Sequence, residues 1–183
     1  MVELNKDKLK KVLLQIDKEY GLLETKLDYK PIVMIVGGCA FILQDLSSRP
    51  VTHDIDVLSY DAALEEIISK YNIVNAQVKT YEDSLPYNYE DRLVIINIGA
   101  KNIEFISPSL EDLVVMKLYG ARPNDLEDIN SEEVINTIDW DIMDYLVFDH
   151  DEAYSSNFIR QRYYEMVNEY KTYAKEHGHE PNV

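Results

Sequence analysis

The sequence predicts an α+β fold, with a small mixed sheet flanked by helices and a helical C-terminal part. Two observations lead to this prediction. Up to Ser107, short runs rich in β-branched residues alternate with segments of helical periodicity, and from Asp125 onward the pattern is almost wholly helical. The chain has 183 residues, of which 46% are hydrophobic, so it is long enough to bury a core.

The expected elements follow from periodicity and from Gly, Pro and capping residues. The expected strands cover residues 32–36, 52–58, 73–81, 92–98 and 102–107, the last two forming a hairpin. The expected helices of this half cover residues 5–20 and 39–46, with a third one capped by Ser59 or Asp61.

The second half is expected to be helical. Ser109, followed three residues later by Asp112, matches a capping box, so a helix should begin there and run to about Tyr119. Further helices are expected over residues 125–137, 140–150 and 155–176. We therefore expect a core over residues 1–122 and a helical extension over residues 123–183 that packs on it.

Composition limits the classes of function. The formal charge of -16 and the pI of about 4.5 argue against generic nucleic-acid binding and against an anionic membrane surface, but suit a basic protein partner. The single cysteine, Cys39, allows no intramolecular disulfide. The first residues contain no apolar signal region, and the longest nearly apolar stretch, residues 31–43, is too short to span a bilayer. We expect a cytoplasmic protein.

Two aspartates one residue apart are the strongest indication of a site. Asp54 and Asp56 share one face of the expected strand with Thr52, because side chains alternate along a strand. Aspartate is depleted in strands, and two neighbouring carboxylates repel each other unless a cation lies between them. A divalent ion with oxygen ligands is the commonest solution, although exposed acids at a sheet edge would also fit the pattern.

A glycine pair precedes these acids. Gly37 and Gly38 end an apolar strand and open the next helix, where glycine lets backbone approach a ligand and the first helical amides favour phosphate. Arg49 and Thr52 would contact the same phosphate or hold the loop. The simpler interpretation is a tight turn without a ligand, with Arg49 as an ordinary surface charge.

These residues resemble a known signature. Gly37-Gly38, fifteen residues and then Asp54-Ile55-Asp56, within Arg49-Pro-Val-Thr-His-Asp-Ile-Asp56, look like the nucleotidyltransferase fold of the DNA polymerase β type. More closely, the chain is similar to bacterial nucleotidyltransferase-like proteins of unknown function, related to abortive-infection toxin nucleotidyltransferases. The resemblance spans roughly residues 30 to 130 and includes three later segments, residues 89–93, 107–118 and 124–129.

The resemblance implies roles for particular residues. Asp54 and Asp56 would hold two Mg²⁺ ions, and a third carboxylate would complete the site and help to deprotonate the acceptor. Glu104 is the first candidate for this third carboxylate, and Glu90 and Asp91 are the alternatives. Lys117 would reach the triphosphate, unless it is an amphipathic-helix lysine that extends to solvent. We expect Asp125 and Asp128 to form a solvated acidic face.

The implied activity is Mg²⁺-dependent transfer of an NMP from an NTP to a hydroxyl of RNA or protein, with release of pyrophosphate. The resemblance places such an enzyme in a toxin–antitoxin or phage-defence system, with a small DNA-binding, antitoxin-like protein as its partner. The alternative is a catalytically inactive relative that serves as a nucleotide-binding or protein-interaction module.

Overall fold

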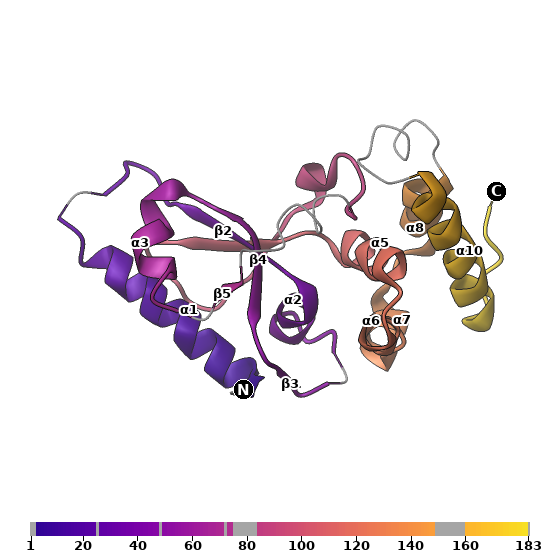
Figure 1. The fold of residues 1–183 in the computed structure, drawn as a ribbon, viewed down its shortest axis with the longest axis horizontal. Helices are drawn as coiled ribbons and strands as arrows, with labels where there is room; N and C mark the ends of the chain where they lie inside the picture. The colour runs from indigo at the N-terminus through magenta and orange to yellow at the C-terminus, as the bar shows by residue number, and fades with distance from the viewer. Residues whose placement is uncertain are drawn as a thin grey trace. The chain divides into compact units, whose positions relative to one another are not determined.

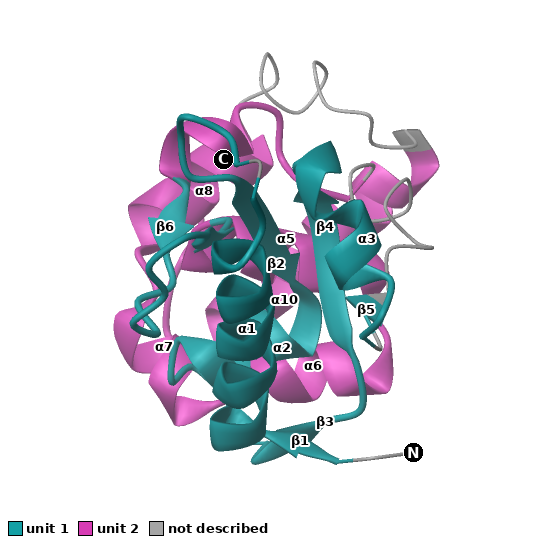
Figure 2. Ribbon diagram, turned by 90° about the vertical axis from the view of Figure 1, so that its left-hand side faces the viewer, with its two compact units in different colours: residues 1–78, 93–108 teal, residues 79–92, 109–183 magenta. Residues whose placement is uncertain are grey.

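The structure, a computed structural model, is shown in Figure 1 and describes residues 3–24, 26–47, 49–71, 73–74, 84–148 and 160–182. The chain divides into two compact units (Figure 2). Unit 1 comprises residues 1–78 and 93–108, and unit 2 comprises residues 79–92 and 109–183. The expected α+β fold class is confirmed. The units do not have the expected bounds, because the helix that begins at Leu110 belongs to unit 2.

Unit 1 is built on a mixed sheet. Its strands, as far as the described residues show, are β1 (Leu4–Asn5), β2 (Ile32–Val36), β3 (Val51–Thr52), β4 (Ile55–Tyr60), β5 (Ile73–Val74), β6 (Val94–Ile95) and β7 (Glu104–Ser107). The main sheet has the order β5-β4-β2-β7-β6, and β1 pairs separately with β3. The central strand β2 runs antiparallel to β4 and parallel to β7. The β6–β7 hairpin confirms the expected one.

Helices of unit 1 bury their apolar sides. They are α1 (Lys6–Gly21), α2 (Gly37–Leu43), the short 3-10 helix η1 (Ala62–Leu64) and α3 (Glu65–Ile68). Helix α1 begins where the Asn5 side chain accepts a hydrogen bond from the Lys8 backbone at 3.0 Å. All residues of α2 are buried, and α2 contacts β2 and β4. The polypeptide turn between β2 and α2 is therefore held in the core of unit 1.

A buried carboxylate ties α1 to the β6–β7 hairpin. Asp17 lies on the inner side of α1 and accepts hydrogen bonds from the backbone N–H groups of Lys101, Asn102 and Ile103, at 3.1, 2.7 and 2.8 Å. Burial raises the pKa of Asp17, but these hydrogen bonds together lower it below its usual value. Asp17 of α1 thus holds the turn between β6 and β7 in place.

In its described residues, unit 2 is made of helices and their connections. The helices are the 3-10 helix η2 (Tyr89–Arg92), α5 (Leu110–Gly120), α6 (Pro123–Ile129), α7 (Glu132–Thr137), α8 (Trp140–Phe148) and α10 (Arg160–Glu176). Helix α5 contacts α6, α8 and α10. The expected cap at Ser109 is confirmed, because its hydroxyl accepts from the Asp112 backbone at 3.2 Å. The expected helix over residues 125–137 is divided, because Ser131 caps the new helix α7.

In the ranges that the structure describes, we find no helix that is both long and apolar enough to cross a membrane. The later part of the expected strand over residues 73–81 and the start of the expected helix over residues 155–176 lie outside the described residues.

Candidate functional site

The turn between β2 and α2 brings Gly37 against Asp56. Gly37 has a φ of +67°, a conformation that residues with a side chain rarely adopt. A Cβ built on Gly37 would lie 2.3 Å from Oδ2 of Asp56, well inside van der Waals contact. The backbone explains this closeness, because Val36 at the end of β2 pairs with Asp56 on β4. Only glycine leaves room for the carboxylate at this point.

The second glycine, Gly38, lies next to Arg49 and Thr52, the two side chains predicted to contact the phosphate. A Cβ on Gly38 would lie 3.2 Å from Nη2 of Arg49 and 3.8 Å from Oγ1 of Thr52. Both side chains are half-buried, and Thr52 donates a hydrogen bond to the Asp54 carbonyl at 3.4 Å. The structure therefore gathers the glycine pair, the guanidinium and the hydroxyl around one turn of unit 1.

Asp54 does not lie on the expected strand. The predicted strand over residues 52–58 is wrong in one respect, because β3 ends at Thr52 and β4 begins at Ile55. Asp54 lies in the bend between them, which ends the β3 pairing with β1 before the β4 pairing with β2 begins. Asp54 and Asp56 are thus not on one continuous strand, although both are only partly exposed.

The buried Cys39 lies beside the backbone of Asp56, with its Sγ 3.7 Å from the Asp56 carbonyl oxygen. Burial raises the pKa of the Cys39 thiol, and the negative charges of Asp56 and Asp54 raise it further. The thiol donates a hydrogen bond to the Val36 carbonyl at 2.9 Å. Cys39 is therefore a neutral packing residue beneath the turn.

The donor set fits a divalent cation that also contacts a phosphate. Carboxylate oxygens are the hard ligands that Mg²⁺ prefers, and Mg²⁺ usually binds to one or two carboxylates plus phosphate oxygens and water. Across the described ranges, no group of three or more His, Cys, Asp or Glu side chains is arranged to hold a metal by itself. Asp54 and Asp56 are suited to a metal that arrives with a nucleotide.

Glu104 is not at this site, which corrects the first choice for a third carboxylate. Glu104 pairs with Ile32 at the start of β2, whereas Asp56 pairs with Val36 at its end. Four residues of strand separate these positions by roughly 13 Å, and β7 lies on the other side of β2 from β4. The alternatives, Glu90 and Asp91, belong to η2 in unit 2.

Lys117 has charged partners within unit 2. Its side chain is 5% exposed, and its ammonium lies 2.7 Å from Oδ1 of Asp125 and 2.9 Å from Oδ2 of Asp128. Burial raises the pKa of Asp125, but Arg122 and Lys117 hold it below its usual value. The expected solvated acidic face is wrong, because both aspartates are buried. This geometry argues against the predicted triphosphate contact and gives Lys117 a structural role.

Arg92 also has a structural partner. Its guanidinium donates to both carboxylate oxygens of Asp112, at 2.8 and 3.0 Å, and Ser109 donates to the same carboxylate. The sequence identified Ser109 and Asp112 only as a helix cap. No local pattern indicated that the cap would receive an arginine from a distant segment.

A glycine turn at the end of one strand faces an acid on the antiparallel neighbour, which is the arrangement that the resemblance to nucleotidyltransferase-like proteins implies. The comparison with protein families agrees. The chain belongs to the family described as Nucleotidyltransferase of unknown function (DUF6036), whose model matches residues 11–177. No curated protein and no solved structure gives a significant match.

Proposed function

We propose that unit 1 binds a nucleoside triphosphate together with Mg²⁺, and that the protein transfers the NMP to an acceptor hydroxyl. The observation that supports this most is the contact between Gly37 and Asp56. It places a carboxylate directly against a backbone turn that carries no side chains, where a phosphate and its metal can share ligands. The family assignment supports the same class of reaction.

Each residue of the turn has a proposed task. Asp54 and Asp56 hold up to two Mg²⁺ ions, which when bound neutralise the phosphate charge and stabilise the departing pyrophosphate. The lack of side chains at Gly37 and Gly38 lets phosphate oxygens approach the backbone, and Arg49 supplies a fixed positive charge beside them. Thr52 fixes the bend through its hydrogen bond to Asp54.

The reaction forms a bond between the acceptor oxygen and the α-phosphorus and breaks the bond to the β-phosphate. Pyrophosphate leaves, and the hydroxyl proton passes to a carboxylate or to water. The register excludes Glu104 from that task. The acceptor is a hydroxyl of RNA or protein.

The distribution of charge supports a basic partner. Unit 1 contains 10 Lys and Arg against 13 Asp and Glu residues, whereas unit 2 contains 8 against 21. Most of the negative charge therefore belongs to unit 2. Opposite charge speeds association and selects partners. A small basic DNA-binding protein in a toxin–antitoxin or phage-defence system suits this unit.

Calorimetric titration with each of the four nucleoside triphosphates, with and without Mg²⁺, tests the proposal. We expect Mg²⁺-dependent binding to the wild-type protein and a loss of at least about tenfold in affinity in Asp56→Asn, which removes one metal-binding charge. Asp28→Asn is the matched control, because Asp28 is an exposed aspartate of the same unit. Equal affinities in wild type and Asp56→Asn would reject the site.

A second measurement separates an enzyme from a binding module. Incubation with α-labelled triphosphate and total RNA or protein should yield labelled acceptor and pyrophosphate, and Asp56→Asn should abolish both. Binding with no transfer to either acceptor would favour the alternative, an inactive nucleotide-binding relative.

A further inference from the structure

The connection from α2 to β3 carries Arg49 and leads to Thr52, the two side chains that lie beside Gly38. It leaves α2 at Asp45, which has a left-handed φ of +62°. This position just after a helix usually holds glycine, because glycine adopts a positive φ without steric cost. Asp45 instead presents a carboxylate at the start of the connection.

Three consecutive residues of unit 1 hold this connection at both of its ends. At the start, the ammonium of Lys6, the first residue of α1, forms an ion pair with the Asp45 carboxylate. At the end, residues 4–5 form β1 and pair antiparallel with residues 51–52 of β3, as Figure 2 shows beside the start of α1. We call residues 4–6 the β1 clamp.

The β1 clamp is itself fixed to α1. The Asn5 side chain caps this helix by accepting from the Lys8 backbone at 3.0 Å, and the Lys8 ammonium donates to the Glu3 carbonyl at 2.9 Å. Helix α1 also contacts α2, the helix from which the connection starts. The clamp and the connection are therefore supported by the same two helices.

We propose that the β1 clamp positions Arg49 and Thr52 for the phosphate of the nucleotide. This inference rests on the proposed function of the glycine turn. A connection that the ligand had to order would reduce affinity by the entropy lost on binding, and a preformed one does not. Lys6 and Asp45 are thus positioning residues, which act on binding through the connection and not through contact with the nucleotide.

Two substitutions of opposite charge test this role by titration with Mg²⁺ and nucleoside triphosphate. Lys6→Met removes a positive charge, and Asp45→Asn removes a negative one while keeping a residue that tolerates a positive φ. Acting only through long-range charge, Lys6→Met would weaken triphosphate binding and Asp45→Asn would strengthen it. We expect both to weaken the affinity about threefold, because each breaks the same exposed ion pair.

The double variant and matched controls sharpen the test. Lys6→Met combined with Asp45→Asn should also lose about threefold, since the two changes remove one shared contact, and Lys6→Arg should restore the wild-type affinity. Lys11→Met and Asp28→Asn make the same charge changes at exposed positions of unit 1 and should leave the affinity unchanged. Thermal midpoints should stay at the wild-type value throughout. Opposite effects of the two single variants, or no effect of either, would overturn the proposal.

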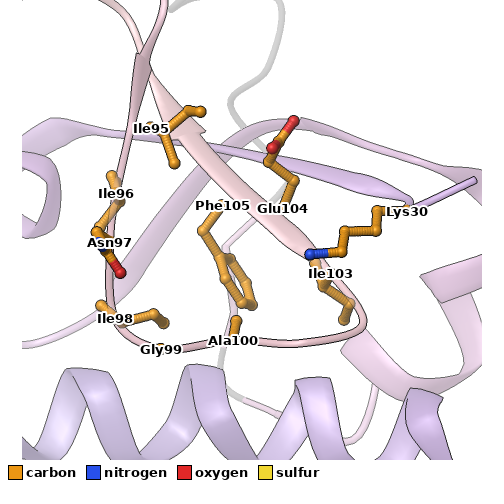
Figure 3. A pocket seen from close by; sticks show the side chains of 10 residues that line it. All are labelled: Lys30, Ile95, Ile96, Asn97, Ile98, Gly99, Ala100, Ile103, Glu104 and Phe105. Atoms are coloured by element: carbon orange, nitrogen blue, oxygen red, sulfur yellow. The ribbon is translucent and has the colours of Figure 1, made fainter.

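NMR spectra without nucleotide separate this proposal from the proposed function. Both single variants should shift the backbone amides of Arg49 and Thr52. They should not shift the amides of residues 95–100, which line a hollow of about 100 Å³ beside the β6–β7 hairpin (Figure 3) and report any general change of unit 1. A wild-type protein that binds no Mg²⁺–nucleotide would reject the proposed function itself. Wild-type binding with unchanged Arg49 and Thr52 amides in both variants would overturn only the clamp.

Discussion

Replacing Gly37 by alanine perturbs the candidate site at its tightest point. The new Cβ would lie 2.3 Å from Oδ2 of Asp56, whereas ordinary contact begins at about 3.4 Å. The carboxylate must therefore move by about 1 Å, or the turn must open by as much. Asp56 is the proposed metal ligand, so the substitution should displace it without changing its charge.

The magnitude has two parts. The positive φ of +67° at Gly37 costs alanine about 1–2 kcal/mol. Moving the carboxylate out of its rotamer or forcing the turn apart adds about 1–3 kcal/mol. Gly99→Ala is the matched control, because Gly99 has a φ of +85° but nothing lies within 4 Å of its added Cβ. The two variants share the conformational term and differ only in the contact with Asp56.

Urea unfolding followed by circular dichroism, together with Mg²⁺–nucleotide titration, measures both effects. Gly37→Ala should lose about 2–5 kcal/mol in the free energy of unfolding, and Gly99→Ala only about 1–2 kcal/mol. Nucleotide affinity should fall in Gly37→Ala and stay at the wild-type value in Gly99→Ala. If the two variants match in stability and in affinity, the reasoning from the Gly37–Asp56 contact is refuted.

Three further results are expected. Asp17→Asn should destabilise the protein by about 2 kcal/mol at neutral pH. Because the folded-state pKa of Asp17 is lowered, its contribution to stability is complete above about pH 5 and is lost as pH falls below about 4. The free energy of unfolding, measured with urea, should therefore change less with pH across this range in Asp17→Asn than in Asp28→Asn. Lys117→Met should destabilise unit 2 by about 3–5 kcal/mol, because it removes the buried cation that Asp125 and Asp128 share. Trp140 fluorescence is the probe, and the exposed Lys175→Met is the unchanged control. Removing Mg²⁺ with EDTA should abolish nucleotide binding, and persistent binding would argue against the metal-dependent site.

Local patterns were enough to predict much of the fold. The helix that became α1, the strand β2 and the hairpin follow from apolar periodicity, and the Ser109 cap follows from one residue pair. The grouping of Gly37, Gly38, Arg49 and Thr52 was also predicted. The glycine pair follows one strand and the two aspartates follow soon after in the sequence, so few other chain paths between them are open. These features depend on residues close in sequence or on neighbouring strands.

The failures have long-range causes. Glu104 was the first candidate for the third carboxylate because it lies on a predicted strand. Its distance from Asp56 depends on strand order and register, which no local sequence pattern predicts. Lys117 and Asp128 appeared to be solvated charges, since sequence alone does not show that opposite charges on separate helices neutralise each other in a core. The bend at Asp54 was missed because alternation looks the same with and without a break.

The central claim is that Asp54, Asp56 and the glycine turn form one site for a metal-bound nucleotide. A crystal structure of the protein with Mg²⁺ and a non-hydrolysable triphosphate tests it most directly. The account predicts Mg²⁺ at about 2.1 Å from carboxylate oxygens of both aspartates, with the triphosphate against Gly37 and Gly38. A metal or triphosphate bound elsewhere, with both aspartates uncoordinated, would contradict it.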